Sequence, residues 1–175
     1  MRESSAEGLQ KEILDLAARR DIADAVQRYM RGLDRLDRAM QRSAFHDDAE
    51  IDCGLMAGKV DAFVDFCQEF LGSMEGSHHL LGQVRIELDG DRARGECYFQ
   101  AWHGTRGSEG EPRDLVIAGR YIDDYRCIDG DWRISRRVLL TDWVTDLPAD
   151  HSFFENSPGA LRGGRRGEDY SQRPR

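Results

Sequence analysis

The chain has 175 residues, 39% of them hydrophobic and 9% aromatic, which fits one globular domain with a sizeable core. Its formal net charge of -8 argues against nucleic acid as a general partner, because phosphate neutralisation needs a basic surface. No segment approaches the roughly 20 apolar residues of a membrane span, and the first residues lead into a charged helix without the apolar core of a signal peptide. We expect a cytoplasmic protein that binds neither nucleic acid nor membrane.

The cysteines give no sign of a metal site. They are Cys53, Cys67, Cys97 and Cys127. Because they lie far apart and form no Cys-x-x-Cys pair, the sequence indicates neither a zinc site nor a disulfide framework. We expect reduced thiols, most of them buried.

The first half of the chain is predicted to be mainly helical. Apolar residues recur at helical spacing over residues 9–36, which predicts one long amphipathic helix whose stripe needs a sheet to cover. The stripe consists of Ile13, Ala17, Ile22, Val26, Tyr29, Met30 and Leu33. A shorter helix over 38–45, a brief strand over 49–53 and a helix over 60–74 follow.

The second half is predicted to form a meander of strands. The strands are expected over about 79–88, 92–104, 114–127 and 131–145, and Asp-Gly turns join the first pair and the last pair. Because hairpins join the strands, the sheet should be largely antiparallel with the helices on one side. This is the α+β arrangement.

Residues 148–175 are expected to form an irregular tail, because they hold three of the four prolines, several glycines and many charges. Phe153, Phe154 and Tyr170 are candidate anchors. The tail is predicted to pack on a neighbouring subunit or on the mouth of the chain's own pocket.

Two aspartates near the end of the first helix are candidates for acid-base chemistry. With Val26 at the centre of the apolar stripe, Asp37 lies near the centre and Asp34 roughly 80° away, so periodicity does not choose between them. An aspartate in the last turn is opposed by the helix dipole, which suggests a compensating role. The alternative is two solvated carboxylates that pair with neighbouring arginines.

Two adjacent histidines begin the first long strand. A carboxylate that orients a neutral imidazole makes a general base that works near neutral pH. Strand alternation places His78 in phase with the apolar residues and His79 with the polar ones, so parity favours His78 unless a bulge intervenes. The alternative is one exposed histidine and one hydrogen-bonded core histidine.

The last strand carries two arginines that must face opposite sides. Alternation places Arg137 in phase with Leu139, Thr141 and Trp143. An internal arginine needs an anion, either a carboxylate or a ligand oxygen that becomes negative during reaction. The alternative is a pair of surface arginines. Further candidates for lining a cavity are Tyr29, Tyr98, Trp102, His103, Tyr121 and Asp142, although aromatic side chains in sheets commonly belong to the core.

Several motifs of other enzyme classes are missing. The sequence contains no G-x-S-x-G elbow, Walker loop, dinucleotide glycine fingerprint or His-Glu-x-x-His. Two consecutive strand histidines diverge and suit one metal poorly. If the chain is an enzyme, acid-base chemistry without a cofactor is what these observations leave.

Four motifs carry a family resemblance. They are Gly32-Leu33-Asp34, the Ser-His-His-Leu-Leu-Gly-Gln run at 77–83, Gly119-Arg120-Tyr121, and the Asp-Gly-Asp-Trp-Arg-Ile-Ser-Arg-Arg run at 129–137. With the order of elements, they resemble the SnoaL-like branch of the nuclear transport factor 2 superfamily, in particular the subgroup of scytalone dehydratase, hexachlorocyclohexane dehydrochlorinase and bile acid 7-alpha dehydratase. The resemblance covers about residues 9–146. It implies an α+β fold: a cone-shaped, curved antiparallel sheet with the N-terminal helices packed on it, also known as a cystatin-like barrel.

The resemblance also implies a domain division and an activity. Residues 1–147 would form the SnoaL-like domain, and 148–175 the tail. The expected activity is that of a cofactor-independent lyase of the dehydratase type, or an isomerase, on a cyclic apolar molecule such as a polyketide, aromatic or steroid-like compound. The alternative is a non-catalytic module for small-molecule binding or oligomer assembly. A homo-oligomer, either a trimer or a dimer, is expected because one face of the sheet would otherwise stay wet.

The family's site residues map onto this chain by position. The catalytic set would be Asp34, His79, Arg137 and Tyr29, so the resemblance favours His79 where parity favours His78. The expected substrate contacts are Cys53, His78, Phe99, Tyr121 and Trp143. Cys53 stands where the dehydratases can present a second tyrosine, which removes one phenol that could polarise a leaving hydroxyl or a carbonyl.

Overall fold

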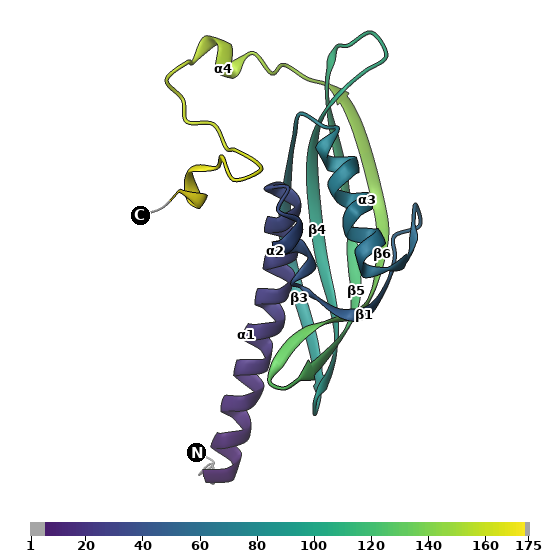
Figure 1. Ribbon diagram of the computed structural model, residues 1–175, viewed down its shortest axis with the longest axis vertical. Helices are drawn as coiled ribbons and strands as arrows, with labels where there is room; N and C mark the ends of the chain where they lie inside the picture. The colour runs from purple at the N-terminus through teal and green to yellow at the C-terminus, as the bar shows by residue number, and fades with distance from the viewer. Residues whose placement is uncertain (1–5, 174–175) are drawn as a thin grey trace.

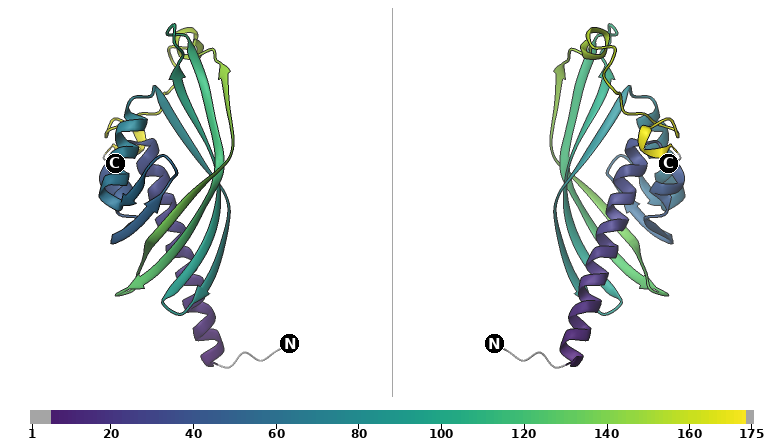
Figure 2. Two further views of the ribbon diagram at one scale, coloured as in Figure 1. Left: turned by 90° about the vertical axis from the view of Figure 1, so that its right-hand side faces the viewer. Right: turned by 90° about the vertical axis from the view of Figure 1, so that its left-hand side faces the viewer.

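The computed structural model describes residues 6–173 and is built on one six-stranded sheet in the order β2-β1-β6-β5-β4-β3. The strands are β1 (Phe45–Asp52), β2 (Ala57–Lys59), β3 (Gly76–Asp89), β4 (Arg92–Arg106), β5 (Pro112–Ile128) and β6 (Asp131–Pro148). Neighbouring strands are antiparallel except β1 and β6, which run parallel. Figure 2 shows that the sheet is strongly curved, with the helices on one side. The predicted α+β class is confirmed.

Three helices, α1 (Ala6–Asp34), α2 (Arg38–Arg42) and α3 (Val60–Gly72), lie on one side of the sheet; α1 and α3 contact the strands, and α2 packs on these two helices (Figure 1). In the C-terminal half of α1 the apolar stripe is buried from Ile22 onward. Its N-terminal half extends beyond the sheet, where Ile13 is 53% exposed. The predicted apolar stripe therefore enters the core only in its second half.

The core lies between these helices and the concave face of the sheet. Its largest fully buried hydrophobic side chains are Ile22, Val26, Tyr29, Phe45, Val60, Phe63, Val64, Tyr121, Tyr125 and Ile134. Several aromatic rings meet edge to face, including Tyr29 with Phe45 at 5.6 Å between centroids, a favourable arrangement of ring quadrupoles. This aromatic cluster fixes the end of α1 relative to the sheet.

Two predicted boundaries differ from the structure between α1 and α3. The helix expected over 38–45 ends at Arg42, because Phe45 begins a strand and is fully buried. That strand, β1, covers residues 45–52 instead of 49–53, and β2 pairs with it in the stretch between the predicted strand and the predicted helix over 60–74. The irregular register between Phe45 and Glu50 hides the strand from a search for simple alternation.

Close backbone approaches and tight turns explain two glycines. A Cβ on Gly32 would lie 2.4 Å from the backbone nitrogen of Gln41, so glycine lets α1 and α2 meet. Asp129 and Gly130 both have positive φ, 53° and 82°, as a two-residue hairpin turn requires. This turn sets the pairing of β5 with β6.

After β6 the chain crosses to the C-terminal end of α1 (Figure 1). Within the described part of this segment, the regular elements are the short helix α4 (Phe153–Asn156) and the 3-10 turn η1 (Tyr170–Gln172). The division of the chain at residue 148 stays a prediction. None of the helices within residues 6–173 combines the length and apolar character that a bilayer crossing needs.

Candidate active site

Asp34, the last residue of α1, contacts His79 near the start of β3. The Nδ1 atom of His79 lies 2.7 Å from Oδ1 of Asp34, and the backbone N–H of His79 donates to both carboxylate oxygens at 3.1 and 3.0 Å. The two side chains are only 7% and 11% exposed. Because an ionised carboxylate only accepts hydrogen bonds, His79 carries its proton on Nδ1. These bonds also offset the unfavourable position of Asp34 at the helix C-terminus.

The other candidate carboxylate has a structural role. Asp37 precedes α2, and its Oδ1 accepts a hydrogen bond of 2.9 Å from the backbone N–H of Met40. It is the N-cap of that helix. The structure thus separates the two aspartates that helical periodicity left open.

A β-bulge decides which histidine faces inward. Leu81 pairs with Phe99 and Val84 with Cys97, so two residues of β3 oppose one of β4. The bulge reverses the alternation, which places His79 on the inner side with the downstream apolar residues and leaves His78 exposed. The parity argument for His78 is therefore wrong, and this side chain is not among the cavity residues.

An apolar cavity of about 450 Å³ lies beside this dyad. Of the predicted site residues, the structure brings Tyr29, Cys53, His79, Phe99 and Tyr121 to its wall. The rest of the wall is mainly apolar and includes Leu33, Phe63, Phe66, Cys67, Phe70, Leu71, Ala101, His103, Ile117, Leu139 and Val144. A mostly apolar wall with a few convergent polar groups is typical of small-molecule sites.

Trp143 does not reach this cavity. Trp143 pairs with Ala118 and Thr141 with Gly119, so Asp142 is an extra residue that reverses the phase of β6. Val144 lines the cavity in place of Trp143, whose side chain is 49% exposed. The expected contact of Trp143 with substrate is corrected accordingly.

Comparison with models of protein families shows which family the chain belongs to. The family model described as the SnoaL-like domain matches residues 14–138. The chain belongs to the SnoaL-like family. This confirms the resemblance inferred from its motifs. No curated protein matches the sequence.

Several solved structures share the fold of this SnoaL-like chain. A hexachlorocyclohexane dehydrochlorinase, LinA type 2, is 24% identical, with a TM-score of 0.72 over 80% of this chain and 95% of its own. LinA type 3 from Novosphingobium barchaimii is 22% identical, with a TM-score of 0.71 over 80% and 97%. A scytalone dehydratase-like protein from Novosphingobium aromaticivorans is 22% identical, with a TM-score of 0.68 over 79% and 93%. At such identities the likeness shows the fold alone.

A second imidazole of the SnoaL-like domain lies next to His79. The ring of His103 is nearly perpendicular to that of His79, with centroids 5.5 Å apart, and its Nδ1 lies 3.3 Å from the carbonyl oxygen of Leu115. Burial, reinforced by the positive charge of a protonated His79, lowers the pKa of His103 to about 4. His103 is therefore neutral near pH 7 and adds no charge to the cavity.

The predicted arginine lies outside the cavity wall. Arg137 is fully buried, and its Nε and Nη2 atoms each lie 2.7 Å from an oxygen of Asp123. Burial alone would lower the pKa of the Arg137 guanidinium, but its attraction to Asp123 outweighs burial and raises the pKa well above the ordinary value. Its carbon Cζ lies over the rings of Tyr29 and Tyr121, 4.2 and 4.1 Å from the centroids. These two rings separate the guanidinium from the cavity.

The two phenols stay protonated. Burial raises the pKa of Tyr29 well above its ordinary value, and the neighbouring Tyr121 raises it further. Burial likewise raises the pKa of Tyr121. Both hydroxyl groups can therefore act as hydrogen-bond donors at any physiological pH.

Sequence reasoning missed two side chains of this region. The hydroxyl of Ser77 donates to Oδ1 of Asp34 at 3.3 Å, and Asp123 pairs with Arg137. Counting back from the Asp129-Gly130 turn pairs Asp123 with Arg136, and an extra residue at Ser135 moves the partner to Arg137. Counting residue pairs from the hairpin turn was therefore the signal in the sequence that could have placed Asp123 opposite one of the two arginines. Within residues 6–173, no group of three or more His, Cys, Asp or Glu side chains is placed to hold a metal ion.

Proposed function

We propose that this SnoaL-like protein is a cofactor-independent lyase or isomerase that removes a proton from carbon with the Asp34-His79 dyad. The observation that supports the proposal is a carboxylate-held imidazole in the wall of an apolar cavity of about 450 Å³. With Nδ1 bonded to Asp34, Nε2 of His79 is the nitrogen left to accept a proton. Asp34 stabilises the imidazolium that forms.

The cavity defines the class of substrate. Its volume lies in the range of small-molecule sites, and its wall offers aromatic and aliphatic contacts with few polar groups. A cyclic, mostly apolar compound such as a polyketide, aromatic or steroid-like molecule fits these properties. The dehydrochlorinase and dehydratase named among the structural neighbours favour elimination as the reaction.

Negative charge that develops on the substrate would meet the two phenols. The hydroxyl groups of Tyr29 and Tyr121 would donate hydrogen bonds to an oxygen or a leaving group and keep their protons. The Arg137 guanidinium lies behind both rings and would act through them rather than by touching substrate. Cys53 and Phe99 complete the predicted substrate contacts that reach the cavity wall.

The first test is a pH titration of the histidine ring signals by NMR in the wild type, in Asp34→Asn and in Asp37→Asn. The Asp34→Asn variant should move the His79 midpoint clearly to lower pH, because the imidazolium loses its counter-charge. Asp37→Asn is the matched control, since asparagine still caps α2 and the Asp37 side chain accepts its hydrogen bond from Met40. An unchanged His79 midpoint in Asp34→Asn would reject the dyad.

A screen for turnover then separates an enzyme from a binding module. Cyclic hydroxy ketones, chlorinated rings and sterol-like compounds are incubated with the wild type and with Asp34→Asn, and elimination products are sought by mass spectrometry. Turnover that is lost in the variant supports the proposal. Binding that is equal in both proteins, without turnover, would favour a non-catalytic pocket. A homo-oligomer, either a dimer or a trimer, stays a prediction that light scattering can test.

A further inference from the structure

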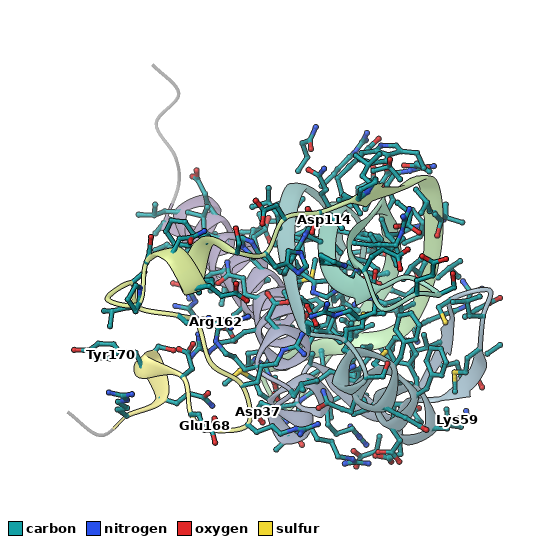
Figure 3. All side chains as sticks on the ribbon, turned by 90° about the horizontal axis from the view of Figure 1, so that it is seen from above. Asp37, Lys59, Asp114, Arg162, Glu168 and Tyr170 are labelled. Atoms are coloured by element: carbon teal, nitrogen blue, oxygen red, sulfur yellow. The ribbon has the colours of Figure 1, made fainter. Side chains whose placement is uncertain are left out.

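The chain after β6 forms a strap, which we define as residues 149–173. It passes beside the C-terminal ends of α1 and α3 (Figure 1). Figure 3 shows its residues Arg162, Glu168 and Tyr170 on the side of the molecule opposite Lys59. A second cavity, of about 350 Å³, separates parts of the strap from the domain, and Asp34 lies in its wall. The dyad is thus reached from the strap as well as from the apolar cavity.

Arg165 connects the strap to the dyad. Its Nη1 donates to the carbonyl oxygens of Leu71 and Met74, both at 3.1 Å. Leu71 lies in the last turn of α3, and Met74 follows the end of that helix. Its Nη2 donates to Oγ of Ser77 at 2.7 Å. The same hydroxyl donates its own proton to Asp34 at 3.3 Å. One guanidinium therefore reaches the dyad carboxylate through a single hydroxyl.

The part of the strap that presents Arg165 is a constrained turn. The carboxylate of Asp169 accepts backbone N–H bonds from Gly164 at 2.8 Å and Ser171 at 2.9 Å, and it lies 3.4 Å from Nε of Arg35. A Cβ on Gly164 would lie 2.7 Å from the backbone nitrogen of Asp169, which leaves no room for a larger residue. These contacts fix the position of Arg165 next to the dyad.

We propose that Arg165 is a positioning residue that acts on the Asp34-His79 dyad through Ser77, an inference that rests on the proposed function of that dyad. Burial lowers the pKa of Arg165, while the negative charge of Asp34 opposes this shift. The cation favours the ionised carboxylate and disfavours a charged imidazole beside it. Arg165 thus keeps His79 in the neutral form that accepts a proton.

Other charged groups face this region and bear on the titration. Asp34 faces His79 on β3 and influences His103 on β4. Arg35 and Arg166 lie close enough to Arg165 to lower its pKa. Each of these groups stays in place in the Arg165 and Ser77 variants below, so differences between those variants report on Arg165 and Ser77.

The test is the NMR titration of His79 in the full chain. Replacing Arg165 with Gln removes the neighbouring cation and should raise the His79 midpoint by about half a pH unit, the size expected of a partly screened unit charge. Arg165→Lys keeps the charge and should restore the wild-type midpoint. Arg173→Gln is the matched control, because it removes a strap arginine whose guanidinium contacts the ring of Tyr170.

The directions of the shifts separate this inference from the proposed function. Asp34→Asn should lower the midpoint and Arg165→Gln should raise it. A response to Asp34→Asn without one to Arg165→Gln would overturn the role of Arg165 and leave the dyad standing. No response to either variant would overturn both.

Loss of strap docking is controlled separately. Hydrogen exchange at the Gly164 amide, which donates to Asp169, reports whether the strap stays bound. If Arg165→Gln releases the strap, Ser77→Ala decides, because it keeps the bonds of Arg165 to Leu71 and Met74. A raised His79 midpoint in Ser77→Ala supports the relay, since His79 is then the one described residue that donates hydrogen bonds to Asp34. An unchanged midpoint contradicts it.

Discussion

Two aspartates of this domain each face a basic side chain, and the two pairs are built for different ends. Asp123 and Arg137 are both fully buried, and two hydrogen bonds of 2.7 Å join them. Asp34 and His79 are slightly exposed and lie between two cavities. A guanidinium cannot lose its proton in a protein, whereas an imidazole exchanges its proton near neutral pH. The first pair therefore takes no part in proton transfer, whereas the second can do acid-base chemistry.

The surroundings of each pair follow the same division. The guanidinium of Arg137 is enclosed by aromatic rings, and its Nη1 has no hydrogen-bond partner within the described residues. Asp34 instead receives hydrogen bonds from the backbone N–H and ring of His79 and from Ser77. Burial of charge alone therefore does not mark the candidate active site. Access to a cavity and a titratable partner do.

The largest effect should come from breaking the dyad. His79→Ala removes the base and should lower turnover by about 10²–10⁴-fold, the usual contribution of general base catalysis. His78→Gln on the same strand is the control, because that side chain is exposed and outside the cavity. Rates with a substrate from the screen, together with circular dichroism, give the comparison. Equal rates for His79→Ala and the wild type would contradict the mechanism.

The next largest effect should come from breaking the buried pair of Asp123 and Arg137. Asp123→Ala leaves Arg137 charged and buried without a counter-ion, which should cost about 3–5 kcal/mol in the free energy of unfolding. Urea denaturation measures this loss. Asp124→Ala is the matched control, since Asp124 is half exposed and 4.0 Å from Arg136, and should change stability by less than about 1 kcal/mol. Similar losses of unfolding free energy in the two variants would show that the buried pair contributes no more to stability than the exposed one.

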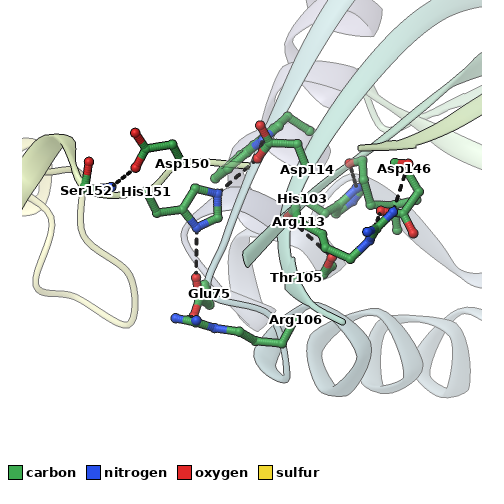
Figure 4. Close-up of polar contacts among 12 residues, drawn as sticks. Glu75, His103, Thr105, Arg106, Arg113, Asp114, Asp146, Asp150, His151 and Ser152 are labelled. Atoms are coloured by element: carbon green, nitrogen blue, oxygen red, sulfur yellow. Dashed lines mark hydrogen bonds and ion pairs between the residues drawn. The ribbon is translucent and has the colours of Figure 1, made fainter. Parts of the chain in front are cut away.

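A smaller effect concerns the strap and depends on pH. His151 bridges two carboxylates, with Nε2 3.0 Å from Asp114 and Nδ1 3.2 Å from Glu75 (Figure 4). Its hydrogen bond to Asp114, supported by Glu75, raises the pKa of His151 above its ordinary value. The bridge therefore stabilises strap docking fully below about pH 6.5, the ordinary value, and loses this effect as pH rises through the raised pKa.

Hydrogen exchange of the strap at several pH values, corrected for intrinsic exchange, checks this prediction. Protection of residues 149–171 should decrease above neutral pH in the wild type and should vary less in His151→Gln. Arg106 pairs with Glu75, and Trp102 donates to Asp114 at 2.7 Å, so both carboxylates stay placed without the histidine. The same pH dependence in both proteins would show that another group controls docking.

The sequence predicted the architecture well because the strands are bounded by Asp-Gly turns and the helices carry apolar stripes. It did not predict side-chain facing, because three extra residues in β3 and β6 each reverse the alternation. The resemblance indicated His79, which lies in the cavity wall, where parity indicated His78, which is exposed. Ser77 and Arg165 escaped notice because their contacts join residues 88 positions apart, which no local pattern records.

The bulge in β3 works like a frame shift in the sheet. Gly82 and Gln83 together occupy the space of one residue opposite Tyr98. With one of them deleted, the ladder would become regular and His79 would still face Asp34. With both residues kept but no bulge, and with the downstream apolar residues in the core, His78 would turn inward and His79 would turn out to solvent. The bulge, and not only the identity of the residues, therefore selects which imidazole the cavity receives.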